Sequence, residues 1–173
     1  AVNIYSALLA ARHIVKADLI IIGMGPGIVG TGTPFGFTGI EQGINVDAVG
    51  NLGGWPVAVP RISFADTRPR HYGISEHTLV ALSRACNQKA IIPLPQLTDK
   101  QKVLIDEKLE AYHIPQKHQV LYLPYEEEMK ILQESDLPLK SMGRSFEDDP
   151  YFFITACLAG RVTAELWKGL RQW

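Results

Sequence analysis

The chain has 173 residues, of which 46% are hydrophobic and 20% charged, and its formal net charge is -1. This length suits one domain with a substantial core, and this composition argues against an intrinsically disordered chain. Because a net charge near zero provides no general attraction for nucleic acid or an anionic membrane, we expect neither as a partner and favour a small molecule.

Cys86 and Cys157 are the only two cysteines, and both lie in hydrophobic patterns of helical type. A thiol in such a pattern usually behaves as a small buried hydrophobic group, and two isolated cysteines do not form a structural zinc site. The sequence shows no secretory leader and no uncharged run long enough to cross a membrane. We therefore predict a cytoplasmic protein without a metal, and the sequence identifies no cofactor.

Hydrophobic runs of strand type alternate with helical patterns along the chain. The first helix is expected within residues 1–18, and the strand-like runs are LIII from residue 19, PVAV from 56, AIIPL from 90, QVLYL from 119 and the weaker LKSM from 139. Runs without polar alternation are typical of strands covered on both faces. We therefore predict one α/β domain over residues 1–173, a Rossmann-like three-layer αβα sandwich with a mainly parallel sheet of about five strands.

Capping signals predict where three of the helices begin. Thr38 with Glu41, and Thr98 with Gln101, each fit the capping box in front of a helix. Asp149 precedes a proline, which suits the N-cap and the first position of the last helix.

The unusual residues gather in three connections that lead from a strand to a helix. These are GMGPGIVGTGTPFGFTG (23–39), RISFADTRPRHYGIS (61–75) and GRSFEDDP (143–150). In a parallel sheet such connections lie at the carboxyl ends of the strands, where open α/β sheets bind ligands. We therefore expect a ligand site at that edge of the sheet.

The first connection holds seven of the fifteen glycines. Its spacing satisfies G-x-G-x-x-G, but further glycines delay the helix to about residue 38, which disfavours ordinary dinucleotide binding. Bare backbone N–H groups and threonine hydroxyls can instead cradle a phosphate or carboxylate, and the residues predicted to do so are Gly25, Gly27, Gly30, Thr31 and Thr33. An equally weighted alternative is a tight loop that packs under another segment or subunit.

The other two connections supply cations and proton-transfer groups. Arg61 and Arg144 are predicted to neutralise the anion, because a guanidinium group suits a carboxylate or phosphate. The candidate catalytic residues are His71, His77 and Asp148, since imidazole and carboxylate groups transfer protons. The alternatives are a structural role for each histidine and, for the acidic residue, a cap on the last helix.

The segments MGPGIVGTGTPFGFTGIEQG (24–43), PVAVPRISFADTRPRHYGISEHT (56–78) and SMGRSFEDDPYFF (141–153) resemble a bacterial family known only as a domain of unknown function. The resemblance covers the whole chain. It implies that a region of similar size precedes Ala1, so that this chain is the C-terminal part of a longer protein, and it implies no activity.

The favoured function is the binding of a small anionic molecule, with phosphate or carboxylate groups, at the glycine-rich connection and the carboxyl edge of the sheet. The sequence leaves open whether this binding serves an enzyme. The alternative is a non-catalytic assembly or regulatory module whose glycine-rich loop packs on the missing N-terminal region of the same protein or on a second copy in a homo-oligomer.

Overall fold

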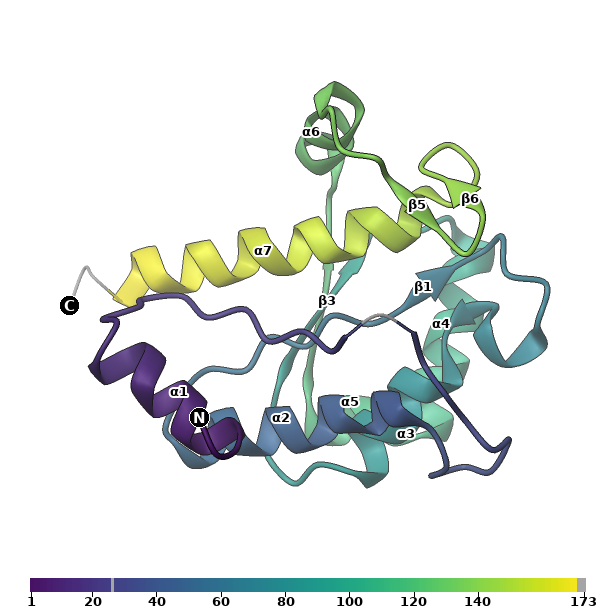
Figure 1. Cartoon of the computed structure of the whole chain (residues 1–173). Coiled ribbons are helices and arrows are strands. Elements are labelled where there is room, and N and C mark those ends of the chain that lie inside the picture. Colours follow the sequence, from purple (N-terminus) through teal and green to yellow (C-terminus); the bar gives the residue numbers. More distant parts are fainter. Residues whose placement is uncertain (26, 171–173) are drawn as a thin grey trace.

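The structure, a computed structural model, describes residues 1–25 and 27–170 (Figure 1). Its helices are α1 (Ile4–His13), α2 (Glu41–Asn51), α3 (Glu76–Arg84), α4 (Asp99–Ala111), α5 (Ile114–Lys117), α6 (Glu126–Glu134) and α7 (Pro150–Leu170), with 3-10 turns at Thr38–Ile40 and Pro69–His71. Its strands are β1 (Ile62–Ser63), β2 (Gly73–Ile74), β3 (Ile91–Pro95), β4 (Gln119–Leu123), β5 (Lys140–Ser141) and β6 (Arg144–Ser145).

The predicted five-stranded parallel sheet, and with it the Rossmann-like sandwich, is wrong. In the described residues the strands form three sheets of two strands each, and only the β3–β4 pair is parallel. The β1–β2 and β5–β6 pairs are antiparallel. The alternating hydrophobic runs therefore misled the prediction of the fold class, because only two of the runs, those that form β3 and β4, pair as parallel strands.

Prolines in β3 explain why the run at residues 56–59 adds no full third strand. The Ile91 N–H donates to the Pro56 carbonyl at 3.0 Å, and one isolated parallel bridge forms there. The next backbone nitrogens that face the same side of β3 belong to Pro93 and Pro95, which have no N–H to donate. The ladder therefore stops after a single bridge.

The first and last predicted strands also fail to join the parallel pair. Residues 19–22 belong to a long extended segment between α1 and α2 (Figure 1), and none of them is assigned to a strand; the Ile21 side chain is 98% exposed. We call residues 14–36 the N-terminal arm. The run from Leu139 contributes Lys140–Ser141 to a tight antiparallel hairpin instead.

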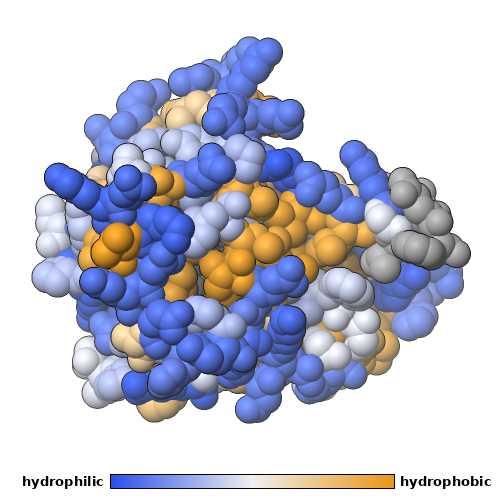
Figure 2. Space-filling view, turned by 180° about the vertical axis from the view of Figure 1, so that it is seen from behind, coloured by the Kyte–Doolittle hydropathy of each residue, from blue (hydrophilic) through white to orange (hydrophobic). Residues whose placement is uncertain are grey.

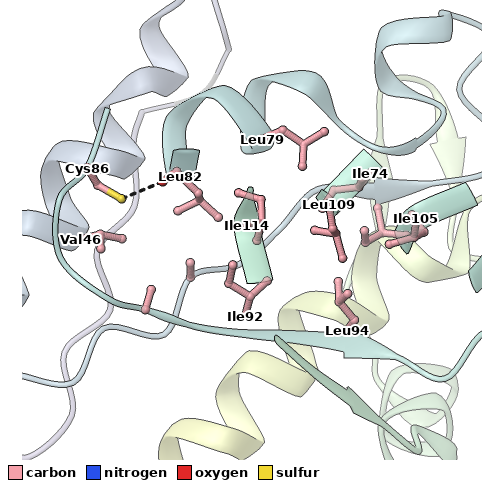
Figure 3. Close-up of a cluster of buried hydrophobic side chains, with 13 residues drawn as sticks. Val46, Ile74, Leu79, Leu82, Cys86, Ile92, Leu94, Ile105, Leu109 and Ile114 are labelled. Atoms are coloured by element: carbon pink, nitrogen blue, oxygen red, sulfur yellow. Dashed lines mark hydrogen bonds between the residues drawn. The ribbon is translucent and has the colours of Figure 1, made fainter. Parts of the chain in front are cut away.

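The main core lies between β3 and helices α3, α4 and α5. Ile92 and Leu94 are fully buried, and because alternate residues of a strand share one face, both reach the same hydrophobic cluster. Figure 3 shows them converging with Leu82, Ile105 and Leu109 from the helices. Helix α7 also packs against β3.

Helix α7 connects the main core to a second, smaller one. Its Ile154 and Leu158 are fully buried in a cluster with Leu132 of α6 and Phe146, while its Tyr151 packs against the main core. No helix among residues 1–25 and 27–170 is both long enough and hydrophobic enough to cross a membrane.

Two of the three predicted helix starts are confirmed. The Thr98 N–H donates to Gln101 Oε1 at 3.2 Å in a capping box, and α7 begins directly after Asp149. The box predicted at Thr38 is wrong, because this residue opens a 3-10 turn and its Oγ1 accepts the Val29 N–H at 3.2 Å. Helix α2 begins at Glu41 without a side-chain cap.

Candidate functional site

Three arginines and two aspartates from distant parts of the chain meet beside β1. Arg61 directly precedes β1, Asp66 and Arg68 follow it, Arg144 belongs to β6, and Asp149 directly precedes α7. Helix α7 packs against β1, which brings the start of α7 to this loop. We call these five residues the arginine cluster.

Asp66 is the centre of the arginine cluster. Its side chain is only 2% exposed, and its Oδ2 lies 2.8 Å from Arg61 Nη2, 2.7 Å from Arg68 Nη2 and 3.6 Å from Arg144 Nη2. The hydrogen bonds from Arg68 are the main reason that the pKa of this carboxyl group lies well below its usual value. Asp66 is therefore ionised at neutral pH.

The second carboxylate, Asp149, is connected to the first through a serine. Its Oδ2 accepts hydrogen bonds from Ser63 Oγ at 2.7 Å and from Arg144 Nε at 3.1 Å. Ser63 Oγ in turn accepts the Asp66 N–H at 3.1 Å. Because both carboxylates are almost completely buried, this network fixes the β1 loop to the segment that leads into α7.

The arginine cluster carries more positive charge than its own carboxylates neutralise. Three guanidinium groups face two carboxylates, which leaves one positive charge. Burial lowers the pKa of Arg61 even though Asp66 opposes the shift. Two buried nitrogens in the described network, Arg61 Nε and Arg144 Nη2, have no hydrogen-bond partner, and a buried polar group left unpaired costs roughly 1–3 kcal/mol. The arrangement can therefore accept another anionic acceptor.

A tight hairpin turn covers one side of the arginine cluster. Met142 and Gly143, the two residues between β5 and β6, have φ of 53° and 80°, as a type I′ turn requires. Met142 Sδ lies 3.4 Å from Arg61 Nη2 and 3.3 Å from Arg68 Nη2. Solvent still reaches the guanidinium groups, since the side chains of Arg61 and Arg144 are 24% and 21% exposed.

The two candidate catalytic histidines lie next to the arginine cluster. His71 is 1% exposed, its Nδ1 lies 2.7 Å from Ser75 Oγ, and its ring meets the ring of His77 edge to face at 4.8 Å. Burial, with a further contribution from Arg61, lowers the pKa of His71 to about 4, so this ring is neutral at pH 7. The structure thus encloses His71 within the protein, and its catalytic role stays a prediction.

The third candidate catalytic residue, Asp148, lies on the surface. Its Oδ2 accepts hydrogen bonds from the backbone N–H and Oγ of Ser145 at 2.9 and 3.0 Å, and these bonds lower the pKa of the carboxyl group. The adjacent Asp149, not Asp148, enters the arginine cluster. A role for Asp148 in proton transfer also stays a prediction.

The glycine-rich connection folds into an exposed hairpin. The Thr31 N–H donates to the Gly36 carbonyl at 2.7 Å, and Thr31 Oγ1 lies 3.0 Å from Thr33 Oγ1, so these polar groups bond within the hairpin. Gly30 pairs with Phe37 in an antiparallel bridge. Phe37, 6% exposed, holds the base of the hairpin against α3 and stacks on the ring of His77 at 4.1 Å.

The structure therefore separates the predicted ligand-binding residues into two groups. It brings Arg61 and Arg144 together around Asp66. Gly25 and Gly27, by contrast, border open space, and no hydrogen bond or ion pair between described residues links residues 23–36 to the arginine cluster. The predicted glycine and threonine cradle would have to act apart from these arginines.

Sequence reasoning did not assign Asp66, Arg68 and Asp149 to the site. It used Asp149 only as the cap of the last helix. A usable signal was present in the Asp-Thr-Arg spacing at 66–68, where the Arg68 N–H and Nε both donate to Asp66 Oδ1, at 3.1 and 2.9 Å. The contact with Arg144, across most of the chain, had no local signal.

Both thiols are free; Cys86 is buried, as predicted, whereas Cys157 is only partly buried. Its Sγ donates to the Leu82 carbonyl at 3.1 Å, and burial raises the pKa of the thiol. Across the described ranges, 1–25 and 27–170, no group of three or more His, Cys, Asp or Glu side chains is placed to hold a metal ion.

Comparison with known proteins yields one match. A family model described as a protein of unknown function (DUF3866) matches residues 1–160. Neither the curated proteins nor the solved structures gave a significant match to the chain.

Proposed function

Because this chain belongs to DUF3866, a family of unknown function, we propose its function from the site alone: it binds a small phosphate- or carboxylate-bearing molecule at the arginine cluster. The observation that supports this proposal is the surplus of positive charge. Two buried nitrogens of the cluster, Arg61 Nε and Arg144 Nη2, also lack a hydrogen bond, although Arg144 Nη2 lies 3.6 Å from Asp66 Oδ2. An incoming anion would neutralise the surplus charge and accept hydrogen bonds from the exposed parts of the arginine side chains.

A purely structural ion-pair network would have a different composition. Buried charges are normally paired and hydrogen-bonded, because an uncompensated charge in the interior is costly. Here three arginines share Asp66, and only Arg144 also bonds to Asp149. An anion would compensate this imbalance, and the partial exposure of the arginines gives it access.

The test is a calorimetric titration and thermal-shift series with inorganic phosphate, sulfate and citrate. At about 100 times its dissociation constant, a ligand stabilises the folded state by roughly 2.7 kcal/mol, which corresponds to about 5–10 °C for a domain of this size. We expect Arg144→Gln to abolish the shift and the exposed control Arg70→Gln, which removes the same charge, to retain it. The absence of a shift with every anion, or equal shifts in both variants, would contradict the proposal.

A second candidate function is self-association through the N-terminal arm. The arm exposes several large hydrophobic side chains by more than half: Ile14 (79%), Val15 (74%), Ile21 (98%), Val29 (73%) and Phe35 (57%). From behind, hydrophobic residues also form a continuous band across the middle of the molecule (Figure 2). Exposed apolar surface of this kind favours a contact with another protein surface, here a second copy of the chain.

Sedimentation velocity tests this second candidate directly. We expect a concentration-dependent dimer that Ile21→Lys converts to a monomer. The control is Val103→Lys, which places the same charge at a side chain of α4 that is 57% exposed, and it should leave the dimer intact. If the wild type is still a monomer at a protein concentration about 100 times a typical micromolar dissociation constant, self-association of useful strength is excluded.

A further inference from the structure

A hydrophobic groove adjoins the arginine cluster. Its volume is about 520 Å³, and its lining consists of Leu104 and Lys108 of α4 together with six residues of the loop between β1 and β2: Phe64, Ala65, Asp66, Thr67, Pro69 and Tyr72. Asp66 lines the groove and is also the residue that the three arginines share, so the groove opens directly beside the charged site.

The walls of the groove are mainly aromatic and aliphatic. The rings of Phe64 and Tyr72 meet edge to face, 5.7 Å apart and at 88°, and Leu104 and Pro69 add aliphatic surface. Tyr72 is 43% exposed, so part of this surface faces solvent. Hydrophobic walls in contact with water are stabilised when a ligand covers them, and aromatic edges favour a flat ring.

The two charged groups that line the groove, Asp66 and Lys108, both have partners. Asp66 is neutralised by its arginines, one of which, Arg68, has a side chain that is 40% exposed. Lys108 Nζ donates to the Tyr72 carbonyl at 2.6 Å, which holds the ammonium group against the loop that forms the wall. A ligand with negative charge on a hydrophobic body therefore complements both parts.

We infer that the ligand is an amphipathic anion: a phosphate or carboxylate that carries an aromatic ring or a body of similar size, with the anionic group at the arginine cluster and the body in the groove. This inference rests on the proposed function, because it places the anionic group at the same site. It adds the ligand class, since a fully polar anion such as citrate would leave the aromatic walls exposed to water.

A ligand series on the wild-type protein tests the inference by calorimetry at fixed ionic strength. The probes are phenyl phosphate, methyl phosphate, inorganic phosphate and phenol. Covering even part of a phenyl ring should improve affinity by roughly tenfold over methyl phosphate. Phenol, which lacks the anionic group, should bind far more weakly than phenyl phosphate.

A matched pair of variants locates the body of the ligand. Leu104→Ala removes a wall of the groove and should weaken phenyl phosphate by about three- to tenfold while inorganic phosphate binds unchanged. Val103→Ala, at the neighbouring exposed position of α4, should alter neither affinity.

The outcomes separate the inference from the proposed function. If phenyl and methyl phosphate bind equally, and both are lost in Arg144→Gln, the anion site stands and the groove is overturned. If no phosphate binds at all, the proposed function fails and the inference with it. If phenyl phosphate binds equally well in Arg144→Gln, its anionic group does not bind at the arginine cluster, and the proposed function fails. If it is weakened equally by both α4 variants, the assignment of the groove is wrong. Because the series on the wild type already decides the ligand class, a variant that fails to fold does not remove the test.

Discussion

The first 60 residues and the rest of the chain use hydrophobic residues in opposite ways. In the described residues, fifteen of the twenty exposed large hydrophobic side chains lie before residue 61, whereas twenty of the twenty-five buried hydrophobic residues lie after it. The later part supplies almost all residues of the two larger hydrophobic clusters, those of the main core and of the second, smaller core. The earlier part adds mainly Val46 and Ala58 to them.

The difference lies in the connections that each region makes. In residues 61–170, several helices pack around β3. Buried side chains there therefore contact partners from distant parts of the chain. In the hairpin of the glycine-rich connection, the hydrogen bonds between described residues stay within residues 29–38. A hydrophobic residue contributes to stability only when a partner removes it from water. The same residue types therefore contribute different amounts to the stability of the folded state in the two regions.

The largest expected effect is on the free energy of unfolding, in a comparison of one isoleucine from each region. Ile92→Ala, at a fully buried position of β3, should lower the free energy of unfolding by about 2–5 kcal/mol, because it leaves a cavity in the main core. Ile21→Ala, at a position 98% exposed, should change it by less than about 0.5 kcal/mol. Urea denaturation followed by circular dichroism measures both. A large loss for Ile21→Ala would break the comparison, since it would mean that the arm is covered in solution.

The next effect concerns the arginine cluster, which depends on a single buried acid. Asp66→Asn removes the charge shared by Arg61, Arg68 and Arg144 and should cost about 3 kcal/mol at neutral pH, because it leaves cations without compensation. The exposed control Asp136→Asn should have almost no effect. Added phosphate should restore more stability to Asp66→Asn than to the wild type. Equal stabilisation of both would show that the anion does not bind near the position of Asp66.

A smaller effect is expected on acidification. Burial lowers the pKa of His71 to about 4, from a usual value of 6.5. The unfolded chain therefore binds this proton more readily than the folded protein, so the stabilising effect is complete above pH 6.5 and is lost as the pH falls towards 4. Between pH 6.5 and 5 the loss should be about 2 kcal/mol.

The control for this pH dependence is a substitution of the same residue type elsewhere. Burial also lowers the pKa of His77 and His118, so the wild type will lose stability through these groups as well. His71→Asn should make the decline between pH 6.5 and 5 shallower, and His13→Asn, at an exposed position, should leave it unchanged. Parallel curves for all three proteins would contradict the prediction, because they would mean that folding does not lower the pKa of His71.

The sequence could predict the parts of this fold that depend on neighbouring residues. The capping box of α4, the start of α7 after Asp149 and the two runs that became β3 and β4 are all local patterns. The absence of a five-stranded sheet could also be predicted in part, because Pro93 and Pro95 occupy alternate positions in β3. The edge of β3 that these prolines block depends on which strands lie beside it, and the sequence of one chain does not reveal the strand order.

The candidate site divides in the same way. Arg61 and Arg144 were predicted as ligand-binding residues from their place in two connections, and the structure does bring them together. Asp66 as their common partner could not be predicted, because the contact needs β1, β6 and the start of α7 to meet. The glycine-rich connection was predicted to lie beside them on the assumption of one continuous sheet edge, and the structure has no such edge.

The smallest effect tests whether the N-terminal arm has a definite conformation of its own. Gly27 has φ of 90°, a region that L-residues rarely adopt, whereas Gly25 does not, and a Cβ at either position would meet open space. Gly27→Ala should therefore cost about 1 kcal/mol through backbone strain alone. Gly25→Ala should be neutral or slightly stabilising, because alanine restricts the unfolded chain. If both substitutions leave the unfolding curve unchanged, the arm adds nothing to the stability of the isolated chain, and its exposed hydrophobic residues would order only on contact with another protein surface. If Gly27→Ala alone is destabilising, the backbone of the glycine-rich connection is set before any partner or ligand arrives.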